Sequence, residues 1–177
     1  MRADASSFIH VEYTAASTRR DSEALDSAEV EDIATHFDLL ERPHRRRMVV
    51  LGDPGSGKTV AATYLVLGLL GMHRELPDAR RTEEPVPVRV DAAGWDCTRS
   101  LTHWLVTRLR YDYRLHLRVG REMIDRGLIL PVIDGLDEMD PPNGDRSRAR
   151  ALPDRLNRAP GVTGRSWSCA APVNSST

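Results

Sequence analysis

One short run of residues has the types and spacing of a phosphate-binding loop. It reads Gly52-Asp53-Pro54-Gly55-Ser56-Gly57-Lys58-Thr59 and fits the pattern G-x-x-x-x-G-K-[ST]. Glycines permit a tight turn, so that backbone N–H groups can converge on phosphates. Lys58 is the only lysine among 25 Lys and Arg residues, and its compact ammonium suits the β- and γ-phosphates better than a guanidinium would. The run predicts a nucleotide site formed by Gly52, Gly55, Ser56, Gly57, Lys58 and Thr59.

A phosphate site that holds a nucleoside triphosphate also needs a divalent cation and oxygen ligands for it. Thr59 offers a hydroxyl at the end of the loop. Asp134 directly follows the apolar run 128–133, and a carboxylate at the end of a neighbouring strand is the usual partner on the metal side. We therefore predict that Thr59 and Asp134 hold Mg²⁺.

Two more carboxylates follow Asp134 within four residues, in the sequence Asp134-Gly135-Leu136-Asp137-Glu138. A carboxylate at this spacing can orient and activate the water that attacks a γ-phosphate, which gives Asp137 and Glu138 a catalytic role beside Lys58. The other interpretation is a solvated acidic turn, and for each residue taken alone the sequence favours neither.

The elements around the loop are those that such a site requires. A buried strand is expected at Met48–Leu51, immediately before the loop, and a mostly buried helix at Thr59–Met72, immediately after it. The run 128–133 is expected to form a second buried strand. Residues 86–91 alternate like a strand with one buried face, and Pro85 and Pro87 place that strand at a sheet edge.

Helices are expected on the remaining segments. Ser100 can cap a helix whose inward face carries Leu101, Trp104, Leu105 and Leu109. Another helix covers 121–126 and ends at Gly127. Residues 1–21 are predicted to be mobile, residues 22–44 to form an amphipathic helical lead-in that Pro43 ends, and the arginine-rich stretch 146–158 to be helical.

Composition narrows the class of protein. The chain has 177 residues, a formal net charge of −1 and 5% aromatic residues, which indicates neither nucleic acid nor a membrane as partner. Cys97 and Cys169 lie far apart, and they fit a reducing compartment rather than a disulfide framework. The longest apolar stretch, 60–72, is too short to span a bilayer. We therefore expect a cytoplasmic protein.

Together these motifs resemble the NACHT family of P-loop NTPases, within the STAND group of signalling ATPases. The resemblance covers residues 33–162 and rests on Gly52–Thr59 and on the D-G-L-D-E run that begins at Asp134. It implies an α/β three-layer sandwich with a parallel sheet ordered 5-1-4-3-2 and the strand at 86–91 at its edge. It also implies ATP or GTP as ligand, Mg²⁺, slow hydrolysis, and nucleotide-controlled oligomerisation in complete members that act in defence or signalling.

The chain departs from this pattern after residue 162. In the family, strand 4 lies between strands 1 and 3 and ends in a sensor arginine. Residues 163–177 contain no apolar run of strand length, so we assign them to a polar tail outside a partial NTPase domain at 45–162. We expect strands 4 and 5 and the lid domains to be missing, Arg165 to be unable to act as sensor because no strand holds it, and the product to be marginally stable with impaired hydrolysis.

Three functions follow from this sequence. The first is a nucleotide-binding and slowly hydrolysing switch. The second is a remnant that binds nucleotide or oligomerises without turnover. The third is a small-molecule P-loop kinase, for which the arginines of 146–158 would form a substrate lid, although Asp137 and Glu138 favour water activation instead.

Overall fold

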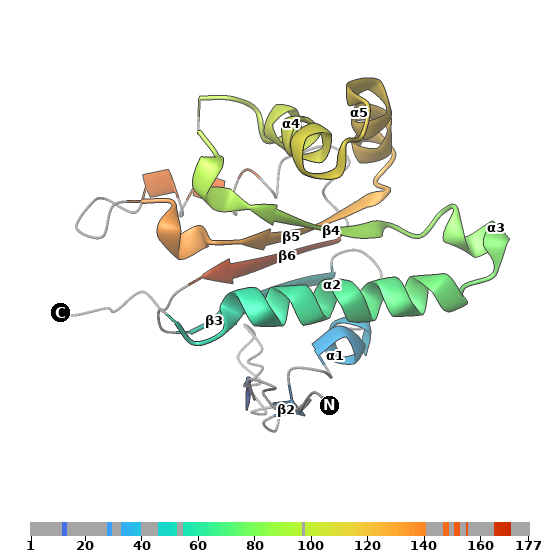
Figure 1. The fold of residues 1–177 in the computed structure, drawn as a ribbon, viewed down its shortest axis with the longest axis horizontal. Coiled ribbons are helices and arrows are strands. Elements are labelled where there is room, and N and C mark those ends of the chain that lie inside the picture. The colour runs from blue at the N-terminus through green and yellow to red at the C-terminus, as the bar shows by residue number, and fades with distance from the viewer. Residues whose placement is uncertain are drawn as a thin grey trace, which may run out of the picture.

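A four-stranded parallel sheet forms the centre of the fold, with helices on both of its faces (Figure 1). The computed structural model describes residues 12–13, 28–29, 33–39, 46–52, 55–96, 98–140, 147–148, 151–152, 155 and 165–170. Within these residues the strand order is β3-β6-β5-β4. Helices α4 and α5 cover one face of the sheet, and α1 and α2 cover the other.

A strand and a helix flank the glycine loop, as expected. Strand β3 spans Arg46–Leu51 and helix α2 spans Lys58–Glu75, so the loop joins the end of a strand to the start of a helix. The expectation that this helix is mostly buried is wrong: of its 18 residues only Lys58, Ala61, Ala62 and Leu65 are buried, and Leu67 is 60% exposed. The reason is that α1 and the sheet pack against one side of α2 only. Its C-terminal end continues into the short helix α3, Asp78–Arg81.

Strand β4, Val86–Asp91, pairs only with β5 among the described strands, which confirms the predicted edge position. The amide of Val86 donates to the carbonyl of Leu128 at 2.9 Å. Because backbone groups alternate in direction along a strand, the nitrogen of Pro87 and the carbonyl of Arg89 then point toward the open edge. Proline at position 87 therefore removes a donor that the sheet does not use.

Strand β5, Ile129–Asp134, is buried on both faces and divides the core in two. Ile129 and Ile133 belong to the cluster under α4 and α5, whereas Leu130 and Val132 belong to the cluster under α1 and α2. Pro131 is tolerated because the pairs that join β5 to β6 begin at the next residue, Val132. This alternation also puts Asp134 on the α2 side of the sheet.

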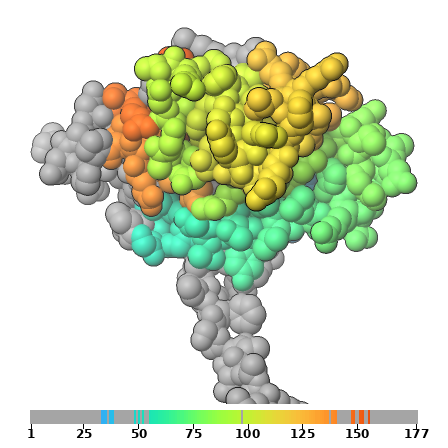
Figure 2. Space-filling model, turned by 45° about the horizontal axis from the view of Figure 1, so that its top comes forward, coloured from blue at the N-terminus to red at the C-terminus, as the bar shows by residue number. Residues whose placement is uncertain are grey.

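The helices on the other face form as their sequence predicts. Helix α4, Leu101–Tyr113, is capped by the Ser100 hydroxyl, which accepts from the amide of His103 at 3.2 Å. All four residues of the expected inward face are buried. Helix α5, Leu117–Asp125, begins earlier than expected, and Gly127 follows it with φ of 68°. In the space-filling view α4 and α5 make up most of the near face, with α2 along its lower border (Figure 2).

Strand β6, Arg165–Ala170, contradicts our expectation that the sheet lacks its fourth strand. It lies between β3 and β5, parallel to both, and its register pairs Arg46 with Arg165 and Leu51 with Ala170. Counted along the chain from β3, the order is 1-4-3-2. The strand was missed because its residues include two serines and an arginine instead of the continuous apolar run usual in an interior parallel strand. Pairing with both neighbours, rather than local hydrophobicity, marks it as a strand.

The position of Arg165 must be corrected as well. A strand does hold this residue, contrary to our premise, but Arg165 is the first residue of β6 and pairs with the first residue of β3. The glycine loop follows the opposite end of β3. The backbone of Arg165 therefore lies at the end of the sheet away from the loop, which does not suit a sensor.

The N-terminal lead-in is less helical than expected. Helix α1 covers only Ile33–Leu39, and the preceding residues Ala28–Glu29 form strand β2, which pairs antiparallel with β1 at Glu12–Tyr13. Helical spacing in a local window cannot anticipate this pairing with a distant segment. Nearly all of the segment predicted to be mobile, residues 1–21, lies outside the described residues.

Two further expectations concern segments that are described only in part. In the stretch 146–158, residues 147–148, 151–152 and 155 are helical. Residues 163–177, which we assigned to a polar tail, contribute β6 to the sheet, and the rest of that segment is outside the described residues. Across the described part of the chain, none of the helices combines the length and apolar character needed to cross a membrane.

Candidate functional site

The glycine loop has a backbone that side chains would prevent. Gly55 and Gly57 have φ of 80° and 87°, a region that residues with a Cβ rarely adopt. A Cβ on Gly52 would lie 2.3 Å from the Ser56 hydroxyl, so the loop closes tightly on its own first residue. The Lys58 ammonium lies across this loop and donates to the carbonyl of Gly52 at 3.0 Å. Gly57 and Lys58 join the loop directly to α2.

The N-terminus of α2 concentrates positive potential at the loop. Its first turn contains Lys58 and no acidic residue, although a cation at this end opposes the helix macrodipole. Gly57 at the N-cap has no side chain with which to satisfy the first amides. The start of α2 therefore lacks both an acidic first turn and a side-chain N-cap, which normally stabilise a helix. A bound anion would supply the missing negative charge and accept from the first amides.

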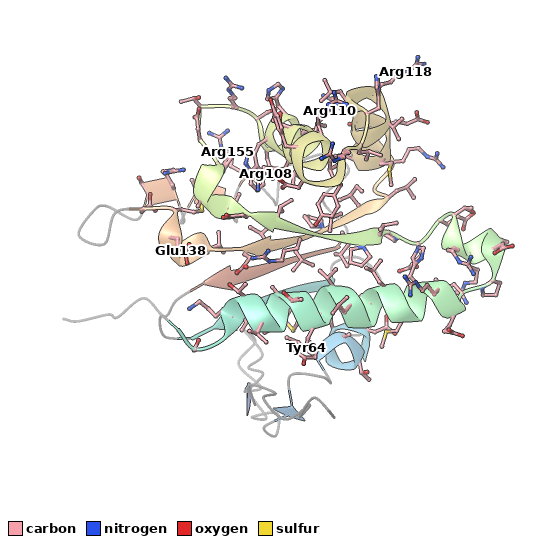
Figure 3. All side chains as sticks on the ribbon, in the orientation of Figure 1. Tyr64, Arg108, Arg110, Arg118, Glu138 and Arg155 are labelled. Carbon is pink, nitrogen blue, oxygen red and sulfur yellow. The ribbon has the colours of Figure 1, made fainter. Side chains whose placement is uncertain are left out.

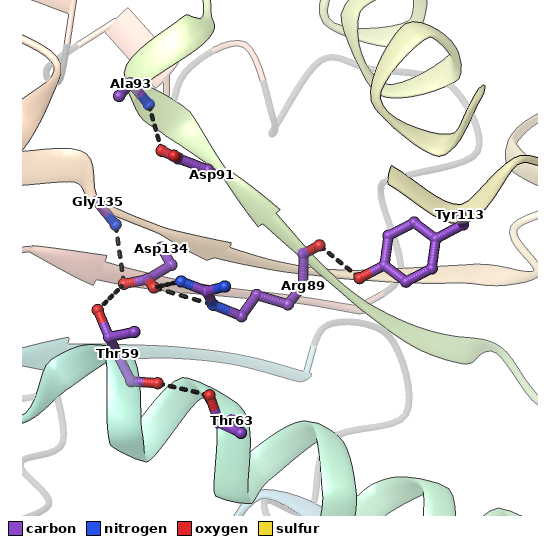
Figure 4. A network of polar contacts seen from close by, with 8 residues as sticks. All are labelled: Thr59, Thr63, Arg89, Asp91, Ala93, Tyr113, Asp134 and Gly135. Atoms are coloured by element: carbon purple, nitrogen blue, oxygen red, sulfur yellow. Dashed lines mark hydrogen bonds and ion pairs between the residues drawn. The ribbon is translucent and has the colours of Figure 1, made fainter. Parts of the chain in front are cut away.

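Thr59 and Asp134 meet beside the loop (Figure 4). The Thr59 hydroxyl, on the first turn of α2, donates to Asp134 Oδ1 at 3.2 Å, and the amide of Gly135 donates to the same oxygen at 2.9 Å. Asp134 is 3% exposed. The elements β5 and α2 thus bring together the two residues that the sequence assigned to a metal, and a hydroxyl with a carboxylate is an all-oxygen donor set that suits Mg²⁺.

Arg89 is a site residue that the sequence analysis missed. From β4 its guanidinium reaches Asp134 Oδ2, to which Nε donates at 3.0 Å and Nη2 makes a second, shorter contact (Figure 4). A usable signal was present, because Arg89 occupies the alternate position between Val88 and Val90 on a strand next to β5. On such a strand a half-buried arginine needs an acceptor on the neighbouring element.

The acidic turn after β5 lies at the same end of the sheet (Figure 3). It forms the 3₁₀ turn η3, Leu136–Glu138, which begins at Gly135 with φ of 74°. A Cβ on Gly135 would lie 3.2 Å from Asp91 Oδ1 and 3.9 Å from Glu138 Oε2, so these two carboxylates flank Gly135. Glu138 is exposed, and the side chain of Asp137 lies outside the described part. The structure thus places Glu138 near the strand end but leaves the role of Asp137 a prediction.

Arg148 hydrogen-bonds to the turn that follows β4 and to the turn that follows β5. It donates to the carbonyl of Met139 at 2.6 Å, to that of Ala93 at 3.2 Å, and through a shorter contact to that of Trp95. The turn η2, Ala92–Gly94, is also capped by Asp91 Oδ1, which accepts from the Ala93 amide at 2.8 Å. An arginine committed to three carbonyls is not available to a substrate, so this member of the arginine-rich stretch does not support the kinase interpretation.

A cavity of about 240 Å³ lies away from these residues, between α1, the C-terminal half of α2 and the start of β4. Its lining includes Phe37, Leu69, Met72, Leu76 and Pro87 and contains no residue of the glycine loop. It is therefore not the phosphate site. Within the described residues no group of three or more His, Cys, Asp or Glu side chains could hold a metal.

Comparison of the chain with protein-family models found no match, and comparison with curated proteins found no significant similarity. Backbone amides, an ammonium and a hydroxyl–carboxylate pair gather where β3 and β5 end and α2 begins. Such a set of groups can bind polyphosphate and a hard divalent cation.

Proposed function

We propose that this chain is a P-loop nucleotide-binding module of NACHT type, which binds ATP or GTP with Mg²⁺ in the cytoplasm and hydrolyses it slowly as a signalling switch. In this proposal the loop 52–59 binds the phosphates, and Lys58 contacts their β/γ end. Thr59 and Asp134 would hold Mg²⁺, which neutralises charge on the phosphates. Glu138 orients the attacking water, and Asp137 remains a second candidate for that role.

One observation carries this proposal: the contact of 3.2 Å between Thr59 Oγ1 and Asp134 Oδ1. The two residues are 75 positions apart, and they were selected from the sequence for one shared task. Chance matches to the loop pattern do not place a carboxylate from the end of a neighbouring strand against the loop's hydroxyl. The positive first turn of α2 supports the same function independently.

The proposal predicts that Lys58→Ala weakens triphosphate binding by about 10- to 100-fold, because a charge-assisted hydrogen bond contributes about 1.5–3 kcal/mol. The measurement is titration of a fluorescent nucleoside triphosphate in the presence of Mg²⁺. Lys58→Arg is the matched variant, and we expect it to bind weakly as well, because the wide guanidinium fits the closed loop poorly. Binding by Lys58→Ala that equals wild type would refute the proposal.

Hydrolysis is tested separately from binding, since the remnant interpretation predicts binding without turnover. If Glu138 positions the water, Glu138→Gln should lower the single-turnover hydrolysis rate by about 100-fold and leave nucleotide affinity unchanged. Asp137→Asn distinguishes between the two carboxylates of the turn. Should wild type bind nucleotide but hydrolyse it no faster than Glu138→Gln, the chain is a binding module only.

A further inference from the structure

The carboxylate of Asp134 already interacts with protein donors at both of its oxygens. Oδ1 accepts from Thr59 and from the Gly135 amide, and Oδ2 accepts two contacts from Arg89. The side chain of Asp134 is 5% exposed, and that of Arg89 is 40% exposed. The residue that we assign to the metal is thus paired with a cation that belongs to the protein itself.

The fold determines the direction in which the Arg89 guanidinium points. On β4 the neighbours Val88 and Val90 are buried in the cluster under α4 and α5, so Arg89 points to the opposite face, toward Asp134. The backbone of Arg89 is held from the other side, because the Tyr113 hydroxyl donates to its carbonyl at 2.7 Å (Figure 4). Burial raises the pKa of Tyr113, and a phenol is in any case neutral and able to donate at physiological pH.

We propose that Arg89 is a positioning residue that sets the affinity of the nucleotide site for Mg²⁺, because its guanidinium competes with the metal for Asp134. This inference rests on the proposed function. Asp134 would hold a divalent cation either with a carboxylate that Arg89 has already neutralised or after the guanidinium has left Oδ2. Both cases weaken metal binding relative to a free carboxylate, since like charges repel and a charge-assisted hydrogen bond is lost.

The partial exposure of Arg89 makes this exchange feasible. If a guanidinium left its partner in a fully buried pair, it would be a desolvated and unpaired charge, which costs a large free energy. The Arg89 side chain is 40% exposed, so it can be hydrated once it leaves Oδ2. The alternative is a purely structural role, in which the pair only fastens β4 to β5. These two roles predict opposite effects on the metal.

The experiment is a Mg²⁺ titration of nucleotide binding by wild type and by Arg89→Gln, followed with a fluorescent nucleoside triphosphate. We expect the Mg²⁺ concentration at half-maximal binding to fall about tenfold in Arg89→Gln, corresponding to the loss of one charge-assisted contact. Arg89→Lys keeps the charge but loses the two-donor contact, and it should lower the midpoint by less than Arg89→Gln does. If Arg89→Gln does not fold, the Mg²⁺ midpoint of Arg89→Lys alone tests the proposal.

Arg121→Gln is the matched control, because it removes an exposed arginine from an i,i+4 pair with Asp125 that does not touch the site. Its midpoint should equal that of wild type. An unchanged or higher midpoint in both Arg89 variants, with wild type still binding nucleotide, overturns this inference and leaves the proposed function standing. Failure of wild type to bind nucleotide at any Mg²⁺ concentration overturns both.

Discussion

A chain that ends at Gly164 should lose cooperative unfolding, because it lacks the strand that joins the two halves of the sheet. Strand β6 lies between β3 and β5, and its pairs with β3 run along the full length of both strands. Each backbone hydrogen bond contributes about 1 kcal/mol net. Native domains are stable by only about 5–15 kcal/mol, so the loss of a whole interior strand is comparable to the total. Thermal unfolding followed by circular dichroism measures this directly.

The matched control for that truncation is a chain that ends at Ala171. It keeps β6 and every pair recorded for it, and it removes only residues 172–177. We expect its unfolding transition to match that of the whole chain. If the chain that ends at Gly164 also unfolds cooperatively at the wild-type midpoint, β6 does not contribute to the stability of the sheet.

The same strand shows what the sequence could not reveal. The predictions for β3 and β5 succeeded because both strands are marked by continuous apolar runs, which local hydrophobicity detects. Residues 165–170 contain two serines and an arginine, and their strand is specified by pairing with segments far away in the chain. Backbone pairing leaves no local signature in side-chain types. The strand was therefore missed, although the strand and the helix on either side of the glycine loop were found.

The residues of the candidate site were predicted or missed for the same reason. Lys58, Thr59 and Asp134 were predicted because each belongs to a short motif whose spacing carries the chemistry. Arg89 was not predicted, since its partner Asp134 is 45 positions away and only the parallel register of β4 and β5 brings them together. Arg148 was missed for the same reason, because it contacts carbonyls of turns that follow two different strands. Local motifs thus name the groups that we propose to bind the ligand, and register determines which residues support them.

We expect Asp134→Asn to lower both stability and the effect of Mg²⁺ on nucleotide binding. All the recorded partners of this carboxylate are donors, namely the hydroxyl of Thr59, the amide of Gly135 and the guanidinium of Arg89. An amide at position 134 must turn its own NH₂ group toward one of these donors, which leaves buried polar groups unpaired. Asp134→Asn should lower the free energy of unfolding by about 2 kcal/mol. This is less than the cost of breaking a fully buried pair, because Arg89 can be hydrated.

For a chain of this size, that decrease in the free energy of unfolding corresponds to a fall of about 5 °C in Tm. Added Mg²⁺ should no longer strengthen nucleotide binding by Asp134→Asn, whereas binding without metal should change little. Asp91→Asn is the matched control: Asp91 pairs in register with Asp134 on the neighbouring strand, is exposed, and accepts from the Ala93 amide through an oxygen that asparagine retains. A variant Asp134→Asn that keeps the wild-type response to Mg²⁺ would place the metal on other residues, and the proposal that Arg89 competes for it would fail with this assignment.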